Sequence, residues 1–268
     1  MGSRVMVFVC MAAISVVMIG GGCGGDKVLV VQCFPTDIGN WWEYEFLSLI
    51  VVYDTVSNDT SEYLYVNSLR DEIDGMDQLS GWQCYRFNQT WVPHIRWFAH
   101  PDTAFLFIAQ IVSTDSSTSS QPLGGLCFIV NGITFHSPGE LASYFRYLLA
   151  GIPWDTDLDT LYITPPHKWY VYPLSVGRSW VKMTDPWYEE REVVAEDSVT
   201  VSAGDFHALK VRVTSDITID LYWSLWIAEQ GMIRDSMYAP GIATNAVGDT
   251  IGYFDSYTIR ELISYHIE

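Results

Sequence analysis

A long succession of short apolar runs, each closed by turn residues, constrains the fold of this chain more than any other feature. The runs are rich in Val, Ile, Tyr, Trp and Thr, which favour half-buried pleated strands. They predict strands at residues 41–52, 62–69, 82–87, 91–98, 104–111, 126–130, 133–136, 180–182, 192–201, 207–214, 220–229, 232–236 and 253–263. Because the turns are short and helices do not alternate with strands, the chain is predicted to be mainly β, with an antiparallel sheet.

Two dipeptides with hairpin chemistry divide these strands. Asn131-Gly132 stands between the apolar runs 126–130 and 133–136, where Asn-Gly is a strong signal for a two-residue hairpin. Asp74-Gly75 has similar chemistry, and it predicts a turn before the strand at residues 82–87.

One packed helix is predicted at about residues 138–149. Ser137 supplies an N-cap, Pro138 suits the first turn, and Glu140 completes a capping box. Apolar residues then recur at helical spacing, at Leu141, Tyr144, Phe145, Leu148 and Leu149. We expect this stripe to cover one face of the sheet as core and not to hold a ligand.

Two segments, residues 34–42 and 172–180, share the pattern aromatic-Pro-x-x-aliphatic-Gly-x-x-Trp. Proline fixes the entry, glycine permits a tight turn, and tryptophan opens the next strand by anchoring in the core. The pattern indicates either an internal duplication or two strands of one sheet that begin with the same turn. A duplication would divide the β-rich domain, residues 34–268, into two subdomains near residues 151–171.

The start of the chain has the composition of an export signal. An apolar run at residues 5–19 follows Arg4, and it is shorter than the roughly 20 residues that span a bilayer. Small residues lead to Cys23, which predicts a signal peptide at 1–22, lipidation of Cys23 and a tether at 23–33. The expected location is the cell envelope, on the periplasmic side or at the cell surface. The alternative is an ordinary signal cut near Gly22, with Cys23 left as a plain thiol.

The net charge limits the partners that the protein can bind, and the cysteines raise the question of a disulfide. The formal net charge is −18, and phosphate backbones repel such a surface, so no nucleic-acid partner is expected. Export permits disulfides, and the simplest expectation for Cys33, Cys84 and Cys127 is one pair and one buried thiol.

The chain carries no complete signature of catalysis or of metal binding. The run Asp155-Thr-Asp157-Leu-Asp159 resembles a calcium loop, but Thr160 and Pro166 stand where an EF-hand has Gly and Glu. The six histidines form no pair at ligand spacing, and no nucleophile elbow occurs. We therefore expect no cofactor, no metal and no enzymatic activity.

The abundant tryptophans are the candidate ligand-binding residues. They could line an apolar pocket or form a platform on which sugars stack, although each could equally be a core anchor. The candidates are Trp82, Trp91, Trp97, Trp223 and Trp226. In the predicted strand at 220–229, Trp223 and Trp226 should lie on opposite faces of the sheet.

Two further segments, Val199–Val211 and Trp226–Arg234, follow the second Pro/Gly turn and carry a resemblance. They resemble the "VTVPAGTFxALKV" and "WxAxGVGxV" segments of uncharacterised bacterial envelope lipoproteins and TapB-like proteins, with Ser202, Asp205 and Gln230 departing from the pattern. The resemblance implies a curved antiparallel sheet or half-barrel around a helix, similar to the lipoprotein-localisation factors, whose concave face can hold acyl chains. The matching residues are turn glycines and core aromatics, so no functional residue is carried over.

The sequence therefore predicts an exported, lipid-anchored envelope protein with a non-enzymatic binding or scaffold role. Its expected partners are the membrane, through the lipid, and an apolar small molecule or an envelope protein. A carbohydrate-binding surface protein that uses exposed tryptophans is the alternative, and a hydrolase without a recognisable motif is the second alternative.

Overall fold

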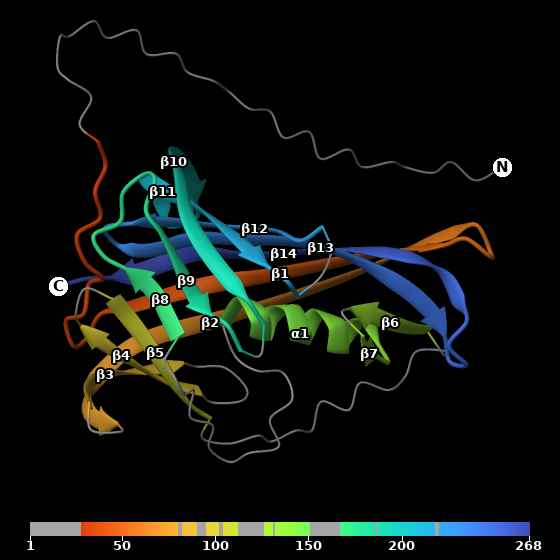
Figure 1. The fold of residues 1–268 in the computed structure, drawn as a ribbon, viewed down its shortest axis with the longest axis horizontal. Helices are drawn as coiled ribbons and strands as arrows, with labels where there is room; N and C mark the ends of the chain where they lie inside the picture. Colours follow the sequence, from red (N-terminus) through yellow and green to blue (C-terminus); the bar gives the residue numbers. More distant parts are fainter. Residues whose placement is uncertain are drawn as a thin grey trace, which may run out of the picture.

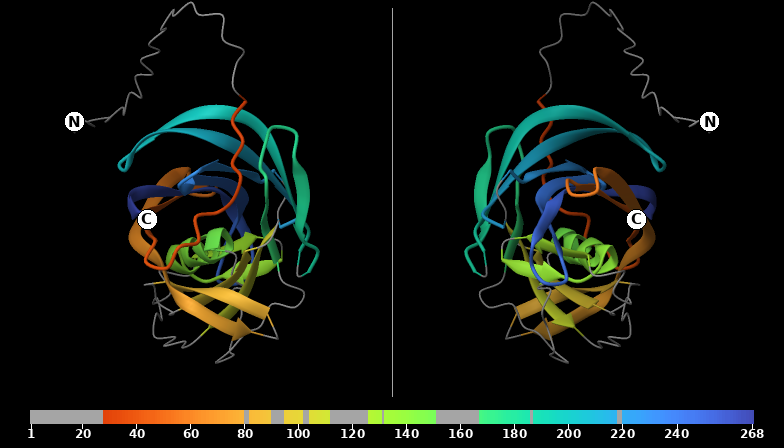
Figure 2. Two further views of the ribbon diagram at one scale, coloured as in Figure 1. Left: turned by 90° about the vertical axis from the view of Figure 1, so that its left-hand side faces the viewer. Right: turned by 90° about the vertical axis from the view of Figure 1, so that its right-hand side faces the viewer.

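The computed structural model describes residues 28–79, 82–89, 95–101, 104–111, 126–130, 132–150, 167–185, 187–217 and 220–268. The described strands form one antiparallel sheet that curls around helix α1, Pro138–Ala150, and the end-on views place the helix inside the curl (Figure 2). The predicted class, a mainly β fold with a curved antiparallel sheet and one packed helix, is confirmed.

The strands follow the chain in two groups. Before the helix come β1 (Trp41–Asp54), β2 (Asp59–Leu79), β3 (Trp82–Gln89), β4 (Ile95–Pro101), β5 (Ala104–Ile111), β6 (Leu126–Val130) and β7 (Ile133–Phe135). After it come β8 (His167–Val171), β9 (Ser179–Met183), β10 (Glu189–Val201), β11 (Gly204–Ser215), β12 (Tyr222–Ala228), β13 (Gly231–Asn245) and β14 (Thr250–His266).

The order of strands across the sheet is β8-β5-β4-β3-β2-β1-β14-β13-β12-β11-β10-β9. The short hairpin β6–β7 branches from the sheet where β6 pairs with the end of β13. The hairpins β1–β2 and β13–β14 are the longest, and they reach past α1 toward the end of the molecule that is opposite the C-terminus (Figure 1).

Helix α1 begins at the predicted N-cap. The Ser137 Oγ accepts a hydrogen bond from the Glu140 N–H at 3.1 Å, and the Glu140 carboxylate accepts one from the His136 N–H at 2.6 Å. These contacts satisfy N–H groups that have no partner within the helix. The apolar stripe of α1 is buried, as predicted, and it packs on the inner face of β1, β2 and β14.

The predicted turn at Asp74-Gly75 is wrong. Strand β2 continues through both residues to Leu79, and a β-bulge between Ile73 and Gly75 absorbs them. The Asp74 carboxylate reaches the next strand, β3, where it lies 2.6 Å from the Arg86 guanidinium. A bulge and a turn favour the same residue types, so the local sequence does not distinguish them.

The two Pro/Gly turns make the same glycine hydrogen bonds, although the Tyr172-Pro173 peptide bond is cis and the Phe34-Pro35 bond is not. In each turn a glycine with positive φ, +105° at Gly39 and +88° at Gly177, donates its N–H to a partner strand. The residue after each glycine accepts an N–H from the same partner residue, which is Ile73 in β2 and Val193 in β10, at 2.8–2.9 Å. A β-bulge follows each partner residue.

The tryptophans that open the two strands are also equivalent. Trp42 and Trp180 are both buried, and each indole N–H donates to a backbone carbonyl, at 2.6 Å and 3.0 Å. Strands β1–β5 with β8 then form one six-stranded meander, and β9–β14 form a second one. Both groups of strands belong to one continuous sheet, and an internal duplication remains a prediction beside the alternative of two strands that begin with the same turn.

The two junctions between these six-stranded groups differ. Strands β1 and β14 are joined along their whole length by backbone pairing. Strands β8 and β9 are instead the two edges of the sheet, and side chains bridge the gap. The Trp180 Nε1 on β9 donates to the Lys168 carbonyl of β8, and the Arg191 Nη1 on β10 donates to the Trp169 carbonyl of β8, both at 3.0 Å. The curl is therefore open at this seam.

Part of the predicted tether packs against the fold. Val31 is buried and pairs with Leu174, beside the second Pro/Gly turn. The Leu29 N–H donates to the Glu196 carboxylate at 2.9 Å. The chain therefore joins the domain close to β10, near the seam.

Candidate functional site

The interior of the curl holds a buried group of charges next to the seam. The Lys182 Nζ lies 2.8 Å from one oxygen of Glu189, and the Arg191 guanidinium lies 2.7 Å from the other. The ring of Trp169, on β8, is 4.1 Å from the Lys182 ammonium and 4.7 Å from the Arg191 guanidinium carbon. These cation–π contacts and the ion pairs brace the strands that the seam leaves unpaired.

Burial and pairing shift the ionisation of this group in opposite ways. Burial opposes the charge of Glu189, but the attraction of Lys182 and Arg191 outweighs it, so the pKa of Glu189 is below its ordinary value. Burial lowers the pKa of Lys182 to about 8 and, with the nearby cations, the pKa of His167 to about 4. His167 is therefore neutral at pH 7, and its Nδ1 has no hydrogen-bond partner among the described residues.

A second buried group lies under the helix. Asp235 accepts hydrogen bonds from the Trp223 indole at 2.6 Å and from Arg260 at 2.9 Å, and Arg260 also donates to the last-turn carbonyl of Leu149 at 3.3 Å. Burial raises the pKa of Asp235 despite these partners. The arrangement anchors the C-terminal end of α1 to the inner face of the sheet.

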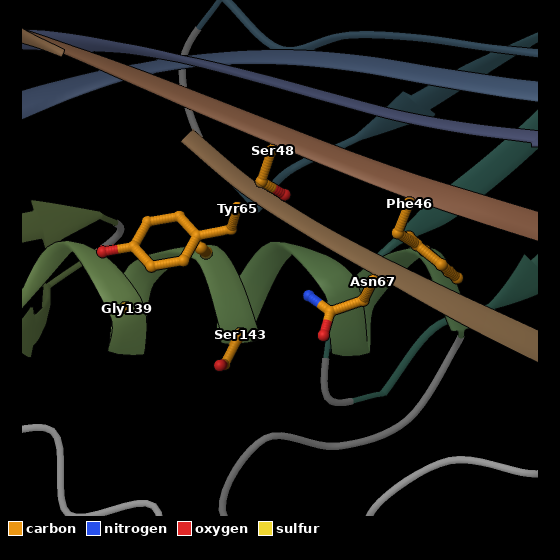
Figure 3. A pocket seen from close by; sticks show the side chains of 7 residues that line it. Phe46, Ser48, Tyr65, Asn67, Gly139 and Ser143 are labelled. Atoms are coloured by element: carbon orange, nitrogen blue, oxygen red, sulfur yellow. The ribbon is translucent and has the colours of Figure 1, made fainter. Parts of the chain in front are cut away.

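A small pocket separates α1 from β1 and β2 (Figure 3). Its volume is about 30 Å³, which is room for about two water molecules. Polar groups from Ser48, Asn67 and Ser143 line it together with the rings of Phe46 and Tyr65. An acyl chain does not fit this pocket, because α1 occupies the space inside the curl.

The structure separates the candidate tryptophans. Trp82 opens β3 and Trp97 lies in β4, whereas Trp223 and Trp226 lie in β12, which four strands separate from β3. Trp91 and Cys23 lie outside the described residues. These tryptophans therefore come from separate parts of the sheet.

The prediction that Trp223 and Trp226 face opposite sides of the sheet is confirmed. Trp223 is buried on the inner face, where it binds Asp235. Trp226 is half-buried on the outer face, where its indole N–H donates to Asp197 at 3.0 Å and its ring lies beside Lys210 and Arg234.

The predicted disulfide is wrong, because no disulfide joins Cys33, Cys84 and Cys127 in the described part of the chain. Cys33 is exposed before β1, whereas Cys84 and Cys127 are buried in β3 and β6. The Cys127 thiol lies 3.5 Å from the His136 Nδ1. The acidic run that resembles a calcium loop lies outside the described residues.

The outer face of the sheet carries a row of apolar and aromatic side chains across five strands. Backbone pairing places the members of the row directly opposite one another, in the order Tyr222 (β12), Tyr238 (β13), Tyr257 (β14), Leu49 (β1) and Leu64 (β2). Cross-strand neighbours of this kind touch through their side chains. The ring centroids are 5.9 Å apart for the first tyrosine pair and 5.1 Å apart for the second.

A second row runs parallel to the first, nearer the tips of the long hairpins. It consists of Ile242, Tyr253 and Tyr53, and the two tyrosine rings stack at 4.7 Å. With Val66, beside Leu64 on β2, the two rows form a surface that we call the tyrosine face. Six of its side chains have between 40% and 68% of their surface exposed: Tyr222, Leu64, Val66, Tyr253, Ile242 and Tyr257.

The outer face of β10 and β11 differs from the tyrosine face. There several basic groups have an acidic partner: Arg212 pairs with Glu192, His207 lies 3.2 Å from Glu196, and Arg234 of β13 lies 2.7 Å from Glu261, while Lys210 lies over the ring of Trp226. We call this surface the paired-charge face. Exposed ion pairs of this kind are expected on a solvated surface.

Sequence reasoning missed the tyrosine face because it treated tyrosine as a strand former and examined the tryptophans for binding. A signal was present: Tyr253, Asp255 and Tyr257 alternate in a predicted strand, so they share one face. The rows themselves depend on the register between β12, β13, β14, β1 and β2, which the local sequence does not specify.

Comparisons with known proteins yield distant structural likenesses. No protein-family profile matches the chain, and no curated protein matches it. A crystal structure of a candidate exported protein from Bacteroides fragilis with a YmcC-like fold is similar at 12% identity and a TM-score of 0.35. A candidate lipoprotein from Parabacteroides distasonis is similar at 13% identity and a TM-score of 0.30. Each match covers 88% of this chain and 99% of the other chain.

The described residues contain no helix that is long and apolar enough to span a membrane.

Proposed function

We propose that this chain is an exported envelope protein, held to a membrane by lipid on Cys23, that binds a partner through the tyrosine face and catalyses no reaction. The observation that carries the proposal is the gathering of exposed tyrosine, leucine, isoleucine and valine side chains on one face of a continuous sheet. Contiguous exposed apolar surface marks interaction sites, and tyrosine is enriched at interfaces.

The interior supports a binding role in preference to catalysis. Apart from His167, the buried charged groups described above are bonded to each other, to an indole N–H group or to backbone carbonyls. A catalytic site would need polar groups that converge on a space for substrate. The pocket beneath α1 has about 30 Å³, so a substrate larger than a few atoms does not enter it.

The export signal before Cys23 supports the anchor. Cys23 is five residues from Val28, so the anchor would lie within about 18 Å of the described chain. The entry of the described chain near the seam favours a membrane on that side, because the tips of the hairpins β1–β2 and β13–β14 project away from the point where the chain enters (Figure 1). Mass spectrometry of the purified chain tests the anchor, because a Cys23→Ala variant should lose the lipid mass and leave the membrane fraction.

A photo-activated cross-linker tests the binding surface. We would place it at Leu64, on the tyrosine face, and in a control variant at Val181, which is exposed on the outer face of β9. In the cells that make the protein, the Leu64 probe should yield a defined cross-linked product that the Val181 probe lacks. Equal yields from both positions would rule out the tyrosine face as the binding surface.

A carbohydrate partner is the second candidate, and the stacked pair Tyr53–Tyr253 is the observation that favours it. Flat aromatic rings beside the carboxylate of Asp255 suit the apolar face and the hydroxyl groups of a sugar. In that case tyrosines, and not the predicted tryptophans, would form the platform.

A further inference from the structure

Along the strand segments that form the tyrosine face, all charges are of one sign. The strand segments that form it, residues 49–64, 220–225 and 236–257, contain six acidic residues and no Lys, Arg or His. The acidic residues are Asp54, Asp59, Glu62, Asp220, Asp249 and Asp255. Asp255 lies between the two rows, in register with Val51, and Glu62 is opposite Val51 on the next strand.

These carboxylates have no cationic partner in the described part of the chain, unlike Glu192 and Glu261, which pair with Arg212 and Arg234. Asp255 accepts a hydrogen bond from the Tyr238 hydroxyl at 2.7 Å, which raises the pKa of Tyr238 to about 12. Asp54 accepts the N–H groups of Val56 and Ser57 at 2.8 Å and 2.9 Å, and these bonds hold its pKa below the ordinary value. Such neutral donors leave the negative charge available to a partner.

The apolar side chains add a second requirement. Leu64 and Val66 on β2 have more than half of their surface exposed, and only an apolar partner removes that surface from water. The tyrosine rings accept both kinds of partner group, because a ring face attracts ammonium and guanidinium groups as well as aliphatic chains.

The same charges disfavour other occupants. A second copy in face-to-face contact would place Asp255 and Glu62 near their own equivalents, and an anionic membrane would meet the same repulsion. A neutral sugar would satisfy the tyrosines but would leave Leu64 and Val66 without an apolar contact.

We infer, on the basis of the proposed function, that the partner is a basic, amphipathic polypeptide segment whose apolar side chains cover the tyrosine face and whose Lys or Arg side chains meet Glu62 and Asp255. Charge complementarity identifies this partner, and the exposed leucine and valine exclude a purely ionic contact. A polypeptide that alternates apolar and basic residues has both properties.

Two synthetic peptides of 18 residues, identical except that one has Lys and the other Glu on its polar side, test the inference with the full chain purified in detergent. The Lys peptide should bind, and the Glu peptide should bind at least about tenfold more weakly. The double variant Glu62→Gln/Asp255→Asn should weaken the Lys peptide about fivefold to tenfold. The control variant Asp197→Asn/Asp205→Asn removes two negative charges from β10 and β11, away from the tyrosine face, and should change binding less than twofold.

Other outcomes overturn the inference. Equal weakening by the two double variants would mean that net charge, and not this face, attracts the peptide. Equal binding of the Glu peptide would remove the charge argument, and binding of a neutral glucan that Leu64→Ser leaves intact would favour a sugar. Unfolding midpoints of all variants exclude loss of the fold as the cause.

The cross-linker at Leu64 separates failure of the inference from failure of the proposed function. If the recovered cross-linked peptide is basic and amphipathic, both hold. If it is acidic, or if the product is a sugar, the face binds a partner of another class and the inference alone fails. If Leu64 and Val181 give equal yields, the proposed function fails as well.

Discussion

The two faces of β12, β13 and β14 use polar and aromatic residues in opposite ways. On the inner face, Trp223, Asp235 and Arg260 bind one another in surroundings without solvent. On the outer face of the same strands, Tyr222, Tyr238 and Tyr257 are aligned in a row that is open to solvent, beside carboxylates without cationic partners. The buried polar groups of these strands therefore stabilise the fold, whereas we expect the exposed aromatic side chains to be the ones that bind a partner.

The largest effect should come from breaking the ion group at the seam. Glu189→Ala leaves Lys182 and Arg191 buried without their carboxylate, so we expect a loss of about 3–5 kcal/mol in the free energy of unfolding. The adjacent Glu190 is only partly buried, and Glu190→Ala should cost less than about 1 kcal/mol. Urea unfolding measures both, and similar losses would contradict the separation of the two faces.

The two tryptophans of β12 provide a matched pair for the same comparison. Trp223→Ala removes a buried ring and the indole donor of Asp235, so we expect a loss of about 3–5 kcal/mol. Trp226→Ala removes a half-buried ring from the outer face and should cost about 1 kcal/mol. Thermal and urea unfolding of the two variants should rank them in this order.

The inner face should also respond to pH. The folded pKa of His167, about 4, lies below its unfolded value of 6.5, so the unfolded chain binds the proton first as the pH falls. The stability that His167 contributes is complete above pH 6.5 and is lost toward pH 4, by roughly 2 kcal/mol. His167→Gln should remove this loss between pH 6.5 and 4.5, as measured by unfolding at several pH values.

Asp71 opposes this effect over the same range. Burial raises its folded pKa to about 6, above its model-peptide value of 3.8, so its contribution to stability grows as the pH falls from 6 toward 4. Asp71→Asn should therefore steepen the acid loss, whereas His167→Gln should flatten or reverse it. Identical pH profiles for these two variants would show that neither group titrates as its surroundings require.

The smallest effect on stability should come from the tyrosine face. Leu64 and Tyr222 close the two ends of the main row and are largely exposed, so Leu64→Ser/Tyr222→Ser should lower stability by about 1 kcal/mol or less. The free energy of partner binding should fall by more than the free energy of unfolding. The matched double variant Val181→Ser/Tyr188→Ser, on the other half of the outer face, should change neither quantity strongly.

Much of the fold follows from local sequence patterns. The helix could be predicted because Ser137, Pro138 and Glu140 form a cap before a 3.6-residue repeat. Most strands could be predicted from period-two alternation, and the turns at Gly39 and Gly177 could be predicted from their shared sequence pattern. Strand β8 was missed, since its five residues border a Pro- and Asp-containing stretch that reads as a linker.

What could not be predicted depends on contacts between distant segments. The bulge at Ile73–Gly75 is stabilised by Arg86 and Asn88 on the next strand, so Asp74-Gly75 alone suggests a turn. The tyrosine face requires the register of β12 with β13, of β13 with β14 and of β14 with β1, and β1 lies about 200 residues away from β14 in sequence.

Footprinting of tyrosines tests the central claim most directly. Hydroxyl-radical labelling would be compared between intact cells and the purified chain, with peptides quantified by mass spectrometry. Tyr222 and Tyr253 should be protected in cells, whereas Tyr188, exposed next to the paired-charge face, should be labelled equally in both states. Equal labelling of all three residues in cells and in the purified chain would mean that nothing covers the tyrosine face, and it would contradict the account.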